Sequence, residues 1–189
     1  MRRSRLKTYS ALLMCVFGAV VGLTSCTRTE HSDSHAPTVG DFCNPLFNYF
    51  KTDFPIDNVQ LSYGGSLSQT VNDLKGNAVC SYAGDLSNPL RGASWLAPAQ
   101  NGEDPSARIN ILKEKGYKLL PGHSAEIWVQ DSREKRPDTT KGVVHLATET
   151  SRWQGELEIL NETGSLAITD AQIGQAADLL IKTTEAMNK

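Results

Sequence analysis

Basic residues are not in excess in this sequence. Its 19 Lys and Arg are outnumbered by 21 Asp and Glu, which gives a formal net charge of -2. Proteins that bind nucleic acid meet its phosphates with clustered Lys and Arg, so no nucleic-acid partner is expected. A hydrophobic run long enough to cross a bilayer is also lacking. The apolar run Ala11–Leu23 holds 13 residues, whereas a spanning helix needs about 20.

Signatures of catalysis are lacking as well. The sequence has no His-Glu-x-x-His pair, no phosphate-binding loop and no dinucleotide fingerprint. After residue 40 it contains only two histidines, His123 and His145, and neither belongs to a nucleophile motif. Glu156 and Glu158 alternate with apolar residues, which is typical of the solvated side of a strand. We therefore expect no enzymatic activity, no cofactor and no metal, with a hydrolase built around His145 or His123 as the alternative.

The first 25 residues differ sharply from the rest. A positively charged segment precedes the uncharged run Ala11–Leu23, and small residues follow that run. The positive charges are those of Arg2, Arg3, Arg5 and Lys7. A short apolar segment between basic and small residues is typical of a secretory signal peptide. We interpret residues 1–25 as a cleaved signal.

The signal ends at Leu23-Thr24-Ser25-Cys26, which resembles the lipobox of bacterial lipoproteins. In a lipobox, an aliphatic residue and two small residues precede the cysteine whose thiol receives diacylglycerol. The resemblance implies a lipid anchor on Cys26, with the membrane as partner, at the extracytoplasmic face of the cell membrane. The alternative is an ordinary signal peptide that ends near a cysteine. The basic segment also resembles a twin-arginine signal, but Arg5 stands where that motif has an apolar residue, so the general secretory route is favoured.

Residues 26–40 have the composition of a flexible tether. They include no aromatic residue, and Val39 is their only large aliphatic one. Such a segment cannot bury enough apolar surface to offset the entropy lost on ordering. His31 and His35 lie in it, but a metal site there would have to offset the same entropy loss, so none is predicted. Residues 41–189 are expected to form one globular domain, because 39% of the chain is hydrophobic and 21% is charged.

Two thiols remain for the mature domain. Cys15 leaves with the signal and Cys26 carries the lipid, which leaves Cys43 and Cys80. An oxidising compartment and an even count predict one structural disulfide between them. A redox pair is the alternative, but their spacing is not Cys-x-x-Cys.

The spacing of apolar residues, Gly and Pro predicts an α+β domain: an antiparallel sheet with helices at both ends and one in the middle, packed on one face. The first helix is expected to begin at Asn44-Pro45, and the last at the capping box formed by Thr169 and Gln172. The expected strands are 59–63 and 67–71, joined as a hairpin by Gly64-Gly65, then 79–83, 125–130, 143–148 and 153–160. The middle helix is expected after Asp104-Pro105 and to end at Gly116. Residues 84–105 are expected to form a loop with at most one strand over 93–97, and the charged stretch 131–141 a solvated connection.

The two cysteines lie in Asp41-Phe42-Cys43-Asn44-Pro45-Leu46 and Ala78-Val79-Cys80-Ser81-Tyr82. Together with the lipobox, the polar tether and the closing amphipathic helix, these segments resemble a group of small actinobacterial envelope lipoproteins of largely unknown function. In that group a tryptophan often stands where this chain has Tyr82. The resemblance implies an anchored α+β domain with a structural disulfide, and no activity.

Two aromatic residues are the candidates for ligand contact. Trp95 and Trp128 lie in the predicted domain, and exposed tryptophans often anchor binding interfaces. The alternative is that both belong to the core. The sequence therefore favours a non-enzymatic binding module whose partner is an envelope protein or a small apolar ligand.

Overall fold

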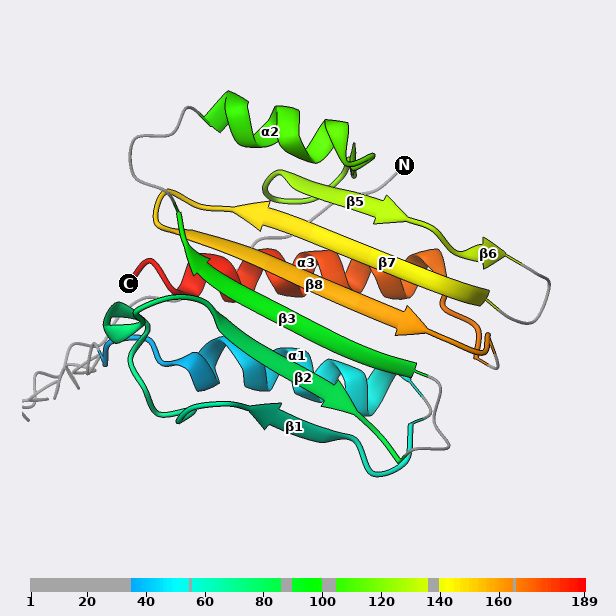
Figure 1. Ribbon diagram of the computed structural model, residues 1–189, viewed down its shortest axis with the longest axis horizontal. Helices are drawn as coiled ribbons and strands as arrows, with labels where there is room; N and C mark the ends of the chain where they lie inside the picture. Colours follow the sequence, from blue (N-terminus) through cyan, green and yellow to red (C-terminus); the bar gives the residue numbers. More distant parts are fainter. Residues whose placement is uncertain (1–34, 55, 86–89, 100–104, 136–139, 165) are drawn as a thin grey trace, which may run out of the picture. The chain divides into compact units, whose positions relative to one another are not determined.

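The computed structural model describes residues 35–54, 56–85, 90–99, 105–135, 140–164 and 166–189 (Figure 1). The expected α+β class is confirmed, because within these residues every strand pairing is antiparallel and three α-helices accompany the sheet. The strand order is β1-β2-β3-β8-β7-β5-β4, and β6 pairs with β7 outside this path. The elements are α1 (Val39–Asp53), β1 (Gln60–Tyr63), a 3₁₀ turn (Val71–Asp73), β2 (Ala78–Ala83), β3 (Leu90–Pro98), α2 (Pro105–Glu114), β4 (Lys118–Leu119), β5 (Ile127–Asp131), β6 (Glu134–Lys135), β7 (Thr140–Glu149), β8 (Trp153–Asn161) and α3 (Asp170–Ala186).

The main core lies between the sheet and the helices α1 and α3, which run side by side behind it in Figure 1. In β8 the buried positions alternate with partly exposed ones, as predicted, so that Leu157 and Ile159 point into this core. Gly155 shares their face, and a Cβ at this glycine would lie 2.1 Å from Thr184 Oγ1 of α3. The missing side chain therefore lets α3 approach the strand closely.

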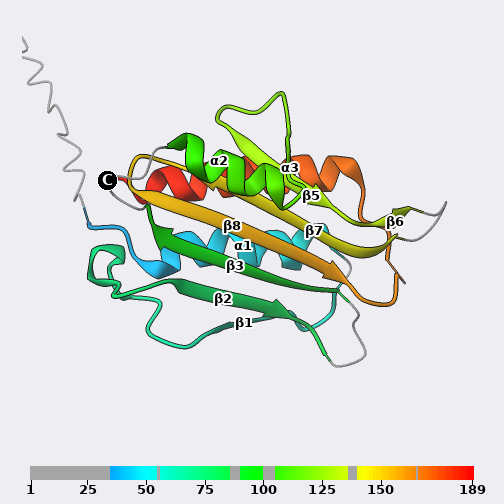
Figure 2. The ribbon, with the colours of Figure 1, turned by 45° about the horizontal axis from the view of Figure 1, so that its top comes forward.

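The position of α2 differs from the expectation that all helices pack on one face. Figure 2 shows α2 in front of the sheet, with α1 and α3 behind it. Leu112 of α2 packs against Trp128 and Ala147, and Arg108 of α2 pairs with Glu156. Strand neighbours alternate between the two faces, so Glu156 lies opposite the core residues of β8. The prediction was wrong because it treated this face as solvated throughout.

The first helix begins earlier than predicted. Thr38, not Asn44, is the N-cap, and its side chain and that of Asp41 form a reciprocal capping box. Pro45 consequently lies inside α1 rather than at its first position. The helix includes Val39, which the sequence assigned to the tether and which is fully buried here.

The expected hairpin around Gly64-Gly65 does not form. β1 pairs with β2 instead, and residues 67–71 lie against the start of α1. There the carbonyls of Leu67 and Gln69 accept hydrogen bonds from the N–H groups of Gly40 and Val39, at 2.7 and 2.9 Å. The first N–H groups of a helix have no partner within the helix. Residues 67–71 therefore supply carbonyl acceptors for the first N–H groups of α1. In a hairpin, these carbonyls would have pointed toward the neighbouring strand instead.

Within the segment predicted as a long loop, the strand is longer than the one expected over 93–97. β3 spans nine residues and lies between β2 and β8. Gly92, which has a low strand propensity, lies opposite Phe50 of α1, and a Cβ there would come within 2.1 Å of the Phe50 ring. Only a glycine leaves room for Phe50 of α1 at this position. The packing of α1 on the sheet therefore outweighs the low strand propensity of glycine.

Other sequence predictions are confirmed. β7 and β8 form the expected hairpin, and Thr169 and Gln172 form the expected capping box at α3. Gly116, just beyond α2, has a φ of +84°, the left-handed conformation expected after a helix end. Asp104, the predicted N-cap of α2, lies outside the described residues.

Cys43 and Cys80 form the predicted disulfide, which links α1 to β2. Their Cα atoms are 6.2 Å apart, and both residues are fully buried. Tyr82 lies beside the bond: its hydroxyl donates to the Cys43 carbonyl at 3.3 Å, and its ring stacks on Phe50 at 5.0 Å. The disulfide and the stacked pair of Tyr82 and Phe50 therefore both hold α1 against β2.

Trp153 carries a buried polar atom with no partner among the described residues. Its side chain is nearly buried, at 4% exposure, and its Nε1–H is unbonded. A buried donor without an acceptor costs about 1–3 kcal/mol, which offsets part of the ring's packing. We expect Trp153→Phe to change the free energy of unfolding in urea by less than about 1 kcal/mol, and Trp153→Ala to lower it by about 4 kcal/mol. Equal losses in the two variants would contradict this.

Candidate functional site

The candidate site lies on the face of the sheet opposite α1 and α3. Strand register places four of its side chains in one row across four strands: Trp95, Glu156, Ala147 and Trp128. The two tryptophans predicted as ligand contacts therefore share this face, but two strands separate them. Helix α2 covers Trp128, which is 9% exposed, whereas Trp95 is half-buried on the sheet. The two tryptophans therefore lie in different environments. Contact of either one with a ligand stays a prediction.

A cavity of about 280 Å³, here called the α2 cavity, lies beside Trp128 between α2 and strands β5 and β7. Ile109, Leu112, Trp128 and Ala147 supply its apolar part. Six further residues of the described chain line it with polar or charged side chains: Arg108, Glu126, Thr148, Glu149, Thr150 and Ser151. An apolar wall with a polar border suits a small amphiphilic molecule.

Arg108 forms ion pairs that hold α2 against the sheet. Its Nε lies 3.0 Å from Glu149 Oε2 on β7, and its Nη2 lies 3.2 Å from Glu156 Oε1 on β8. The Arg108 side chain is 18% exposed, so solvent screens these pairs only in part. Two carboxylates thus share one guanidinium, and Glu126 makes no ion pair with any residue that the structure describes.

A cation already contacts the aromatic wall. Lys113 Nζ lies 5.7 Å from the centre of the Trp128 ring. The faces of aromatic rings carry negative charge density, so they attract ammonium groups at this range. The Trp128 ring is therefore placed where it can interact with positive charge.

His145, a sequence candidate for catalysis, lies on the same face next to a carboxylate. Its Nδ1 is 3.5 Å from Glu158 Oε2, and its ring lies 6.5 Å from that of Tyr117. Burial raises the pKa of Tyr117, and the neighbouring charges of Glu156 and Glu158 raise it further. Tyr117 is therefore a neutral hydroxyl near pH 7. Within the described part of the chain, no Ser, Thr or Cys side chain hydrogen bonds to His145.

His123, the other candidate, lies on the α3 side of the sheet. Its Nδ1 is 2.6 Å from Asp178 Oδ1 of α3. Since His145 lies on the opposite face, the structure does not bring the two histidines together.

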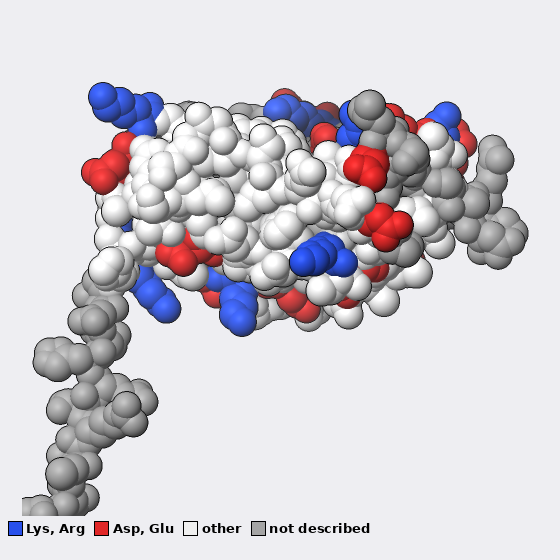
Figure 3. All heavy atoms as spheres, turned by 90° about the horizontal axis from the view of Figure 1, so that it is seen from below, with Lys and Arg blue, Asp and Glu red and all other residues white. Residues whose placement is uncertain are grey.

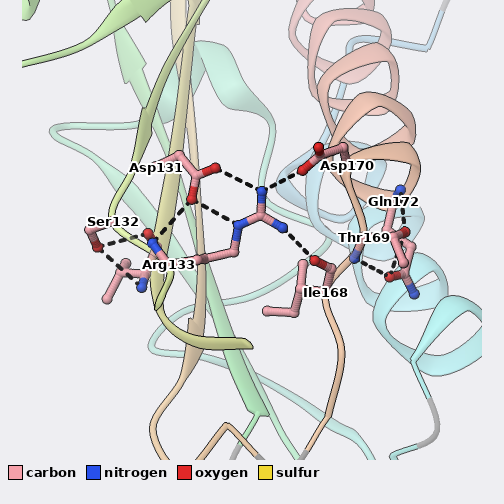
Figure 4. A network of polar contacts seen from close by, with 8 residues as sticks. Asp131, Ser132, Arg133, Ile168, Thr169, Asp170 and Gln172 are labelled. Carbon is pink, nitrogen blue, oxygen red and sulfur yellow. Dashed lines mark hydrogen bonds and ion pairs between the residues drawn. The ribbon is translucent and has the colours of Figure 1, made fainter. Parts of the chain in front are cut away.

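Arg133 lies in a polar network at the start of α3 (Figure 4). Its side chain is 1% exposed, pairs with Asp131 and Asp170 at 2.7 Å each, and donates to the Ile168 carbonyl. Burial alone would lower the pKa of Arg133, but the hydrogen bonds to the two carboxylates raise it overall. The prediction of a solvated connection over 131–141 is thus wrong at Arg133, which joins the end of β5 to α3.

Two further predictions fall largely outside the described residues. The first is the lipid anchor on Cys26. The second is that His31 and His35 form no metal site, and of these two histidines only His35 is described. Within the described residues, no group of three or more metal-ligating side chains is found, and no helix is long and apolar enough to cross a bilayer. Comparison with protein-family models, curated proteins and solved structures finds no match to this chain.

Sequence reasoning missed Arg108, Lys113, Glu126 and Glu149 as site residues. Each is an ordinary charged residue of a helix, turn or strand end in the sequence. They come together only because α2 packs on the outer face, so no local motif could have identified them.

Proposed function

We propose that this protein is a membrane-anchored, extracytoplasmic binding module that takes a small amphiphilic ligand in the α2 cavity. The lipid on Cys26 would hold it at the membrane, and the domain itself would carry no catalytic activity. The observation that carries the proposal is the α2 cavity, with its apolar wall and polar border.

The apolar wall is separate from the main core. Leu112, Trp128 and Ala147 form a small cluster of their own, with Ile109 and Tyr117 packed against it. Burying apolar surface of a ligand there contributes about 25 cal/mol for each Å² removed from water. Ligand cavities usually measure about 300–1,000 Å³, so a volume of about 280 Å³ suits a small molecule better than a peptide.

The geometry favours binding over the hydrolase alternative. His145 and His123 lie on different faces of the sheet, and each pairs with a carboxylate. Covalent hydrolysis through a histidine needs a side-chain nucleophile within hydrogen-bond reach of that base. Among the described residues, neither histidine has a hydroxyl or thiol hydrogen-bonded to it.

Filling the cavity tests the proposal. We expect 2-phenylethanol, a small amphiphile, to bind the lipidated protein in phosphatidylcholine nanodiscs. Ala147→Leu would occupy part of the cavity and weaken binding by at least about tenfold, because about 1.4 kcal/mol of lost contact is a factor of ten. Calorimetry against empty nanodiscs measures it.

The matched control is Ala93→Leu, which makes the same change on the same face but does not line the cavity. It should leave binding unchanged. Thermal melts of both variants show whether folding is retained. An absence of binding to the parent protein, or equal weakening by both substitutions, would count against the α2 cavity as the ligand site.

A further inference from the structure

We infer that the α2 cavity selects ligands with an ammonium head group on a short apolar body. This inference rests on the proposed function, since it names the chemical class of the ligand for the same cavity. It is carried by the charges at the cavity border and by the contact of Lys113 with Trp128.

The charged lining of the cavity is negative once its internal pairs are formed. Among the residues that the structure describes, this lining contains one cation, Arg108, and two carboxylates, Glu126 and Glu149. Arg108 is already shared between Glu149 and Glu156, so it has little capacity left for an anionic ligand. Glu126 is exposed and forms no ion pair with a described residue. An incoming carboxylate or phosphate would therefore meet repulsion, and an ammonium group attraction.

The aromatic wall favours the same class. Trp128 lines the cavity and already has an ammonium group, Lys113 Nζ, 5.7 Å from its ring centre. A ligand ammonium near this ring would gain the same attraction. The hydroxyl of Ser151, also in the lining, can accept a hydrogen bond from such a head group.

Lys113 provides a direct test of the inference, because its ammonium group would repel the positive charge of a ligand bound beside Trp128. Removing its ammonium should strengthen the binding of a cationic ligand and leave a neutral ligand unaffected. A cavity that recognised anions would behave in the opposite way, since Lys113 would then be one of its attractive groups.

Three matched probes test the inference: 2-phenylethylammonium, 2-phenylethanol and 3-phenylpropionate. They share a phenyl group on a short chain and differ in the charge of the head. Each is titrated at pH 7 and low salt into the lipidated full chain in phosphatidylcholine nanodiscs. We expect the ammonium to bind about fivefold tighter than the alcohol, and the carboxylate to bind most weakly, as one exposed charge pair allows.

Two substitutions locate the selectivity. Glu126→Gln should weaken ammonium binding about threefold without changing alcohol binding, and Lys113→Gln should tighten ammonium binding about threefold. Glu185→Gln is the matched control, because it removes the same charge from an exposed position on α3 outside the cavity. It should change neither.

The outcomes separate the two claims. If the alcohol binds as tightly as the ammonium, or if Glu126→Gln leaves their ratio unchanged, the selection of cations is overturned while the proposed binding site stands. If none of the three probes binds, both claims fall. If the carboxylate binds most tightly, the cavity recognises anions and the inference is wrong.

Discussion

Replacing both Cys43 and Cys80 by alanine should lower the free energy of unfolding by about 4 kcal/mol. The disulfide joins residues 37 positions apart in the chain. In the chain-entropy model, opening a loop of this length restores freedom to the unfolded state, which the oxidised protein does not have. For a domain of this size the melting temperature should fall by about 10 °C. Urea denaturation and thermal melts measure both quantities.

The single variants provide the control. Cys43→Ala and Cys80→Ala each break the same bond, so each should lose nearly as much stability as the double variant. Losses that simply add would show that the two side chains stabilise the domain independently. Free thiols at both positions in protein taken from the envelope, or a loss below about 1 kcal/mol in the double variant, would contradict the structural role of the bond.

Cys26→Ser should abolish membrane association. The proposed anchor is a lipid on this thiol, and a hydroxyl cannot take its place in the thioether. Acyl chains contribute about 0.8 kcal/mol for each buried CH₂, so losing them should shift the protein from the detergent phase to the aqueous phase by far more than tenfold. Detergent-phase partitioning of fractionated cells measures this shift, and mass spectrometry of the mature N-terminus detects the lipid.

Cys15→Ser is the matched control for the anchor. It makes the same chemical change within the proposed signal, which is removed on maturation, so the mature protein should be identical to the parent. A Cys26→Ser protein that still partitions into detergent like the parent would show that the anchor is not on this cysteine.

The sequence by itself determined the features that short segments encode. The capping box of Thr169 and Gln172 and the apolar stripe after it specified α3, because these signals act within one or two helical turns. The β7–β8 hairpin followed from the alternation of apolar and polar residues across a short turn. The pairing of Cys43 with Cys80 followed from counting the thiols that would remain after the proposed export and lipidation.

Only the tertiary structure decided which distant segments meet. Residues 67–71 are strand-like in sequence but accept hydrogen bonds from the start of α1, and β3 is a central strand although Gly92 weakens its local preference. The same holds for the α2 cavity. A helix with apolar residues can pack on either side of a sheet, and the choice depends on partners distant in sequence, here Trp128 and Ala147 for Leu112. Packing energies of this kind are not local, so the site residues Arg108 and Glu126 became recognisable only once the face covered by α2 was known.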